Sequence, residues 1–148
     1  QDGPHKDLRR ARCAAANIVP TSTGAALAVT ETIPELKGLF DGTSMRVPTA
    51  VVSLADFTFV LKRRTTVDEV KKAFKKACAS ARYKGIMACT EEELVSSDFI
   101  KNPHSSIVDL NLTQLVDGDL LKVVAWYDNE WGYSNRLGEM AVRVGKSL

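Results

Sequence analysis

The stretch Trp126-Tyr127-Asp128-Asn129-Glu130-Trp131-Gly132-Tyr133-Ser134-Asn135-Arg136 decides how the surrounding chain is interpreted, because it holds both tryptophans and two of the three tyrosines. The apolar run at 120–125 before it predicts a strand. Apolar residues after it at 137, 140, 141 and 144 predict an amphipathic helix. A polar-aromatic turn between two rigid elements is a common place for a binding site, since the elements orient the turn. Composition alone allows a corner of aromatic packing equally well.

Strand signals extend outward from this stretch. Residues 105–116 read as a strand, and Asp117-Gly118 is a hairpin signal that joins it to the strand at 120–125. Two further strands are expected at 51–62 and 83–89. These segments pair most simply as neighbours in a sheet that is largely antiparallel.

Helix signals complete the fold class. Thr66-Val67-Asp68-Glu69 has the capping-box pattern and opens a helix whose lysines form a solvated face. A short helical turn is expected at 90–93. Because the helices are grouped rather than alternating with the strands, we expect an α+β fold. Its sheet is mixed and largely antiparallel, with five to seven strands and three or four helices on one face.

Composition limits the function. The 148 residues suit one domain, and a net charge of +2 gives no argument for nucleic acid or a membrane surface as a partner. No apolar run approaches the ~20 residues that span a bilayer. Three cysteines (Cys13, Cys78, Cys89) fit neither a disulfide framework nor a metal site, so we expect no metal and a reducing, cytoplasmic compartment.

Three parts of the sequence are candidates for an anion site. Thr21-Ser22-Thr23-Gly24 precedes a short alanine-rich helix, and hydroxyls with a glycine allow a phosphate to reach unpaired N–H groups at a helix start. Taken alone, simple capping of the helix by Thr23 is the favoured alternative. Arg46 stands among apolar neighbours, where an arginine needs an anionic partner. The basic run at 5–12 either binds an anion or forms interface salt bridges.

Five blocks of sequence together resemble one family. They are Pro4-His5-Lys6-Asp7-Leu8-Arg9-Arg10-Ala11-Arg12, Pro20-Thr21-Ser22-Thr23-Gly24-Ala25-Ala26, Arg46-Val47-Pro48-Thr49, Leu94-Val95-Ser96-Ser97-Asp98-Phe99 and 126–134. In order and spacing they are similar to phosphorylating glyceraldehyde-3-phosphate dehydrogenase of the bacterial and plastid type. The resemblance is to its C-terminal catalytic domain and covers residues 1–148, as a domain incomplete at its N-terminal side.

The resemblance implies roles for specific residues. Thr23 and Gly24 match the family's phosphate-binding pair, Arg46 its phosphate-gripping arginine, and Arg10 a further phosphate-contacting arginine. We expect them to converge on negatively charged groups beside a pocket edged by Asn129. The implied ligands are a phosphorylated aldehyde and inorganic phosphate.

The cofactor implied is NAD, with NADP as an alternative. Asn129 matches the asparagine that hydrogen-bonds the nicotinamide carboxamide, and Tyr133 matches the aromatic residue beside that ring. The implied glycolytic reaction converts glyceraldehyde 3-phosphate to 1,3-bisphosphoglycerate. The resemblance also implies a homo-tetramer in which Arg9 and Arg12 make subunit contacts, and a cytoplasmic or plastid location.

The same resemblance implies that catalytic parts lie elsewhere. The family's nucleophile motif, Ser-Cys-Thr-Thr-Asn, does not occur in this sequence. We expect the nucleophile, the histidine base and the NAD-binding N-terminal domain to precede Gln1. No catalytic residue is therefore assigned in this chain, and the isolated chain is expected to be inactive and to associate. The alternatives are a fragment of the related erythrose-4-phosphate dehydrogenase and a non-catalytic assembly or binding module.

Overall fold

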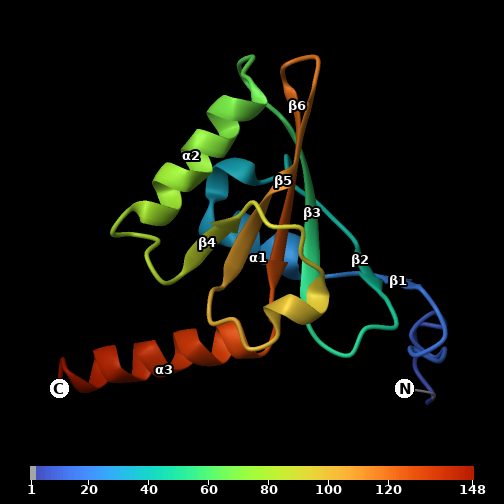
Figure 1. Ribbon diagram of the computed structural model, residues 1–148. Coiled ribbons are helices and arrows are strands. Elements are labelled where there is room, and N and C mark those ends of the chain that lie inside the picture. The colour runs from blue at the N-terminus through green and yellow to red at the C-terminus, as the bar shows by residue number, and fades with distance from the viewer. Residues whose placement is uncertain (1–2) are drawn as a thin grey trace. The chain divides into compact units, whose positions relative to one another are not determined.

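The computed structural model describes residues 3–148 and divides the chain into two compact units, Gln1–Ala50 and Val51–Leu148. Figure 1 shows the course of the chain through both units. None of the helices in residues 3–148 has the length and apolar character needed to cross a membrane. The assignment of the whole chain to one incomplete domain stays a prediction.

The first unit is built around a two-stranded antiparallel ribbon. Strand β1 (Val19–Thr21) pairs with β2 (Ser44–Arg46), placing Val19 opposite Arg46 and Thr21 opposite Ser44. Helix α1 (Ala25–Thr32) follows β1 directly and ends before a 3-10 helix, Pro34–Leu36. Proline has no N–H to continue the helix, which accounts for the end of α1 just before Pro34.

The second unit holds a four-stranded sheet in the order β3-β6-β5-β4. The elements are β3 (Ser53–Val60), α2 (Val67–Ala79), β4 (Met87–Thr90), a 3-10 helix (Ser96–Phe99), β5 (Ser106–Val116), β6 (Leu120–Tyr127) and α3 (Trp131–Gly145). Only β4 and β5 pair in parallel. The predicted α+β class is confirmed, although the strands of residues 3–148 form two sheets instead of one.

The two strongest local signals are confirmed. Asp117 and Gly118 both have positive φ, 48° and 78°, as the turn of a tight hairpin requires. The Thr66 hydroxyl accepts the Glu69 N–H at 3.2 Å, and the Glu69 carboxylate accepts the Thr66 N–H at 3.2 Å. These reciprocal bonds form the capping box that opens α2.

Three predicted boundaries are wrong. The strand expected at 83–89 begins at Met87, because the N–H groups of Ile86 and Met87 both bond the Tyr83 carbonyl in a turn. The helical turn expected at 90–93 lies instead at Ser96–Phe99, since Thr90 is still paired with Asp109 in the sheet.

The third error concerns the start of β3, which was expected at residue 51. Val52 has a φ of 75° and breaks the extended run, so the strand begins at Ser53. A positive φ is strained for a β-branched residue. Val52 is buried against Phe99 and Ile107, and this packing holds the conformation.

Each face of the sheet has its own core. On one face Val70 and Phe74 of α2 cover a buried cluster in which Leu110 is fully enclosed; the other members are Val108, Leu121 and Val123. On the other face Trp126 stacks on Phe99, with ring centroids 5.2 Å apart. Trp126, at the end of β6, therefore takes part in aromatic packing, as the tryptophan-rich stretch suggested.

Helix α3 forms as predicted, but its apolar face stays uncovered by the described residues. Leu137, Met140 and Val144 are 58%, 55% and 49% exposed, and Gly132 is the buried residue of the helix. Figure 1 shows α3 running outward from the end of the sheet. Within this unit α2 covers a face of the sheet, whereas α3 does not. The expectation that helices cover one face of the sheet therefore holds for α2 and not for α3.

Candidate functional site

Asp128 anchors the turn between β6 and α3. It is 4% exposed, and its Oδ1 accepts the N–H groups of Trp131 at 2.9 Å and Glu130 at 3.2 Å. Its Oδ2 accepts the Lys101 N–H at 2.9 Å. The Trp131 N–H, followed by those of Lys101 and Glu130, holds the pKa of Asp128 below its usual range, against the opposing effect of burial.

The sequence interpretation did not single out Asp128. A usable signal was present, since an aspartate just before a predicted helix is a typical partner for the unpaired N–H groups of the first turn. The same bonds fix the backbone on both sides of Asn129, the residue predicted to contact a cofactor.

Replacing Asp128 by asparagine is expected to lower the free energy of unfolding by about 1–3 kcal/mol at pH 7, because a charged acceptor of three N–H bonds is lost. The folded pKa lies below the unfolded value of about 3.9, so this contribution is complete above that value and falls as pH drops through the folded pKa. Urea unfolding at pH 7 and pH 3 measures it.

The difference in the free energy of unfolding between the original protein and the Asp128→Asn variant should therefore be smaller at pH 3 than at pH 7. The exposed Asp68→Asn on α2 serves as the control and should change stability by no more than about 1 kcal/mol, as expected for a charge near a helix start. An Asp128→Asn deficit of the same size at both pH values would contradict the role assigned to the carboxylate.

Asn129 and Tyr133 are presented to solvent by this turn. The Ser53 hydroxyl, at the start of β3, donates to Asn129 Oδ1 at 3.2 Å and orients the amide. Tyr133 is 68% exposed in the first turn of α3. No sequence signal points to Ser53, because it lies 76 residues from Asn129 and reaches it only through the pairing of β3 with β6.

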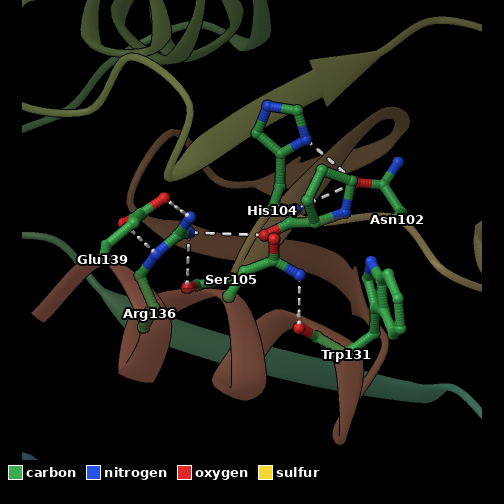
Figure 2. Close-up of polar contacts among 8 residues, drawn as sticks. Asn102, His104, Ser105, Trp131, Arg136 and Glu139 are labelled. Atoms are coloured by element: carbon green, nitrogen blue, oxygen red, sulfur yellow. Dashed lines mark hydrogen bonds and ion pairs between the residues drawn. The ribbon is translucent and has the colours of Figure 1, made fainter. Parts of the chain in front are cut away.

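The first half of α3 is fixed to the segment before β5. Arg136 donates to the Pro103 carbonyl and to Ser105 Oγ, each at 3.3 Å, and pairs with Glu139 through Nε at 2.7 Å (Figure 2). These contacts determine where the turn that carries Asn129 stands relative to the sheet.

Gly132 allows the helix to approach this segment closely. A Cβ at this position would lie 3.0 Å from the His104 carbonyl oxygen, which belongs to the backbone and cannot swing aside. The His104 ring itself contacts Asn102 Oδ1 through Nδ1 at 2.9 Å, as Figure 2 shows. Glycine is thus required here by packing.

In the first unit, Arg10 is held against the end of β1. Its Nη2 donates to the Ser22 carbonyl at 3.0 Å and to Ser22 Oγ at 3.2 Å, and its Nε donates to Thr21 Oγ1. Asp7 lies 3.4 Å from the same Nε. The guanidinium is therefore oriented by the hydroxyl-rich stretch, and one carboxylate already balances part of its charge.

Thr23 and Gly24 form the start of α1. Thr23 Oγ1 accepts the Ala25 N–H at 3.1 Å and its O–H remains a donor, but Thr23 is not the N-cap residue that the alternative assigned it to be. Gly24 is the N-cap residue, with an ordinary φ of −83°. Within the described residues nothing would lie within 4 Å of a Cβ on Gly24, so the space beside this helix start is open.

Arg46 lies on the same face of the ribbon as Thr21. Paired residues of a ribbon share a face and every second residue returns to it, so Val19, Thr21 and Arg46 lie on one side. Arg46 forms no ion pair with any carboxylate among residues 3–148. The ribbon thus brings Arg46 to the side where Thr21 contacts Arg10.

The predicted site residues fall into two groups. Arg10, Thr23, Gly24 and Arg46 belong to the first unit, on and around the ribbon. Asn129 and Tyr133 belong to the second unit, on the strand-turn-helix corner. Convergence of the two groups on one pocket stays a prediction.

The described residues have an α+β fold, with a strand-turn-helix corner held by Asp128 and an arginine-bearing ribbon. The family model for the glyceraldehyde 3-phosphate dehydrogenase C-terminal domain matches residues 1–129. The chain belongs to this family, which confirms the resemblance seen in the five sequence blocks.

Proteins named glyceraldehyde-3-phosphate dehydrogenase are similar over the whole chain. The one from Mycobacterium tuberculosis H37Rv is 57% identical over 148 residues, which are 100% of this chain and 43% of that protein. The one from Zymomonas mobilis is 54% identical over 147 residues, 99% of this chain and 44% of that protein. The chain therefore spans less than half the length of these relatives.

Proposed function

We propose that this chain is the C-terminal catalytic part of a phosphorylating glyceraldehyde-3-phosphate dehydrogenase. The proposed glycolytic reaction oxidises and phosphorylates glyceraldehyde 3-phosphate to 1,3-bisphosphoglycerate with NAD and inorganic phosphate. The observation that carries the proposal is 53–57% identity to proteins of that name along essentially the entire chain. The proposed compartment is the cytoplasm, in keeping with three free cysteines.

In this proposal Arg10, Thr23, Gly24 and Arg46 bind phosphate groups. A guanidinium keeps its charge at any physiological pH and donates two parallel N–H bonds to phosphate oxygens. Two observations support this role. Arg46 forms no ion pair with a carboxylate within the described residues, and the space beside Gly24 is open. The hydrogen bonds from Arg10 to Thr21 and Ser22 keep its guanidinium in place.

Asn129 and Tyr133 are proposed to hold the nicotinamide end of NAD, which would accept hydride when bound; NADP is the alternative. The donor set fits, because the Ser53 hydroxyl occupies Asn129 Oδ1 and leaves the amide Nδ2 free to donate to a carboxamide oxygen. Exposed Tyr133 offers a flat ring on the same turn.

The chain itself is proposed to bind and orient, and not to attack the aldehyde. A nucleophile and a base must be within hydrogen-bond reach of the reacting groups. The family's Ser-Cys-Thr-Thr-Asn motif does not occur among the 148 residues. The 148-residue chain alone is therefore expected to be inactive.

A hybrid protein tests this proposal. The upstream portion of the Mycobacterium tuberculosis relative is joined to this chain, and absorbance at the reduced-nicotinamide band is followed with glyceraldehyde 3-phosphate, NAD and inorganic phosphate. We expect the hybrid to reduce NAD, and this chain or the upstream portion alone to give no signal. Erythrose 4-phosphate and NADP serve as parallel substrates that separate the alternatives.

Two outcomes would contradict the proposal. One is NAD reduction by the 148-residue chain alone. The other is a hybrid that is folded by circular dichroism yet inactive with every substrate, which is the behaviour expected of a non-catalytic assembly module.

The same proposal includes a homo-tetramer. On the sheet face opposite α2, the paired residues Val60 and Leu120 are 82% and 40% exposed, and exposed apolar side chains of this kind support a subunit contact. Light scattering on the hybrid gives its mass directly. A monomer at micromolar concentration would contradict the tetramer.

A further inference from the structure

Two of the three cysteines meet between α2 and the sheet. Cys89 pairs in register with Val108, whose side chain belongs to the core beneath α2, so Cys89 faces the helix. Cys78 follows Val70 by eight residues and Phe74 by four, which places it on the helix face that packs on the same core. Sequence spacing predicted no such pair.

The two thiols are neighbours at one interface and are accessible. Strand register and helix position direct both side chains into the space between α2 and the sheet, and both residues are free and partly exposed. Burial, followed by the neighbouring Cys89 thiol, raises the pKa of Cys78 to about 11. Cys78 is therefore a protonated thiol at neutral pH, and its reactivity is low until Cys89 has reacted.

We propose that Cys78 and Cys89 form a reversible disulfide that joins the C-terminal end of α2 to the edge strand β4. A disulfide needs Cβ atoms about 3.5–4.5 Å apart, and α2 packs directly against β4, so the backbone brings these two side chains to one interface. The bond closes the short loop that includes the turn around Tyr83. It is independent of the dehydrogenase activity and of the first unit.

The oxidant is a low-molecular-weight disulfide such as glutathione disulfide. Thiolate Cys89 attacks one sulfur of the oxidant, forms a mixed disulfide and releases one glutathione thiolate. Cys78 then gives its proton to solvent and attacks the Cys89 sulfur, and the second glutathione leaves. The protein dithiol loses two electrons and two protons, and glutathione disulfide gains them.

The order of attack follows from the protonation of Cys78. Closure requires the Cys78 thiolate, so its rate should rise roughly tenfold per pH unit between pH 7 and pH 9. Closing the loop restricts the unfolded chain, and the melting temperature should rise by roughly 5–10 °C. Dithiothreitol should reverse both changes.

The test uses the 148-residue chain carrying Cys13→Ser, incubated with glutathione disulfide at low protein concentration. Intact mass should fall by the mass of two hydrogens, and a non-reduced peptide map should contain Cys78 linked to Cys89. In a Cys78→Ser background Cys89 should carry one glutathionyl group. In a Cys89→Ser background Cys78 should be modified at least roughly tenfold more slowly at neutral pH.

Three results would overturn the proposal: an unchanged mass after oxidation, two glutathionyl groups on one chain, or disulfides between chains only. Circular dichroism of each variant confirms that it is folded. Alanine at either position is the second variant, used if serine in this partly buried site prevents folding.

Discussion

Replacing Arg46 by leucine in the hybrid dehydrogenase is expected to lower kcat/KM for glyceraldehyde 3-phosphate about 100-fold. A charge-assisted hydrogen bond contributes about 1.5–3 kcal/mol, and Arg46 is proposed to make such bonds with phosphate. The loss should be largest at low inorganic phosphate. Initial rates at varied aldehyde and phosphate concentrations measure it.

Two controls separate phosphate binding from general damage. Arg46→Lys keeps the positive charge and loses the paired N–H geometry, so we expect a fall of about tenfold. Arg63→Leu removes an exposed arginine from the second unit and should leave kcat/KM unchanged. Equal losses for Arg46→Leu and Arg63→Leu would refute a specific role for Arg46.

Leu110→Ala is expected to lower the free energy of unfolding by about 2–5 kcal/mol, the usual range for a buried leucine that leaves a cavity. Leu110 has 0% exposure in the cluster beneath α2. Whole domains are stable by only about 5–15 kcal/mol, so this single change removes a large share. Urea unfolding followed by tryptophan fluorescence measures it, since Trp126 stacks on Phe99.

Leu112→Ala is the matched control on the same strand. Leu112 is 40% exposed, and its truncation should cost less than about 1 kcal/mol. Similar losses in the free energy of unfolding for Leu110→Ala and Leu112→Ala would contradict the placement of Leu110 in the core.

The sequence predicted elements whose signals are local. The Asp117-Gly118 turn and the Thr66–Glu69 capping box depend on neighbouring residues, and both are confirmed. The start of β3 was misjudged because Val52 takes a positive φ that its own side chain disfavours, and only packing against Phe99 explains it.

Contacts between residues far apart in the chain could not be predicted from the sequence. The bond from Ser53 to Asn129 depends on the pairing of β3 with β6, and the approach of Cys78 to Cys89 depends on the packing of α2 against β4. No residue near either pair encodes these arrangements. Family membership, by contrast, was visible in five motif blocks. The motifs identify Arg46 and Thr23 as candidates, whereas the ribbon explains why Arg46 shares a face with Thr21.

A crystal structure of the hybrid with inorganic phosphate would show directly whether Arg46, Thr23 and Gly24 bind one anion. We expect a phosphate held by the Arg46 guanidinium together with Thr23 and Gly24, with Arg10 in contact. Density for phosphate at other residues, with Arg46 directed away from the start of α1, would contradict it.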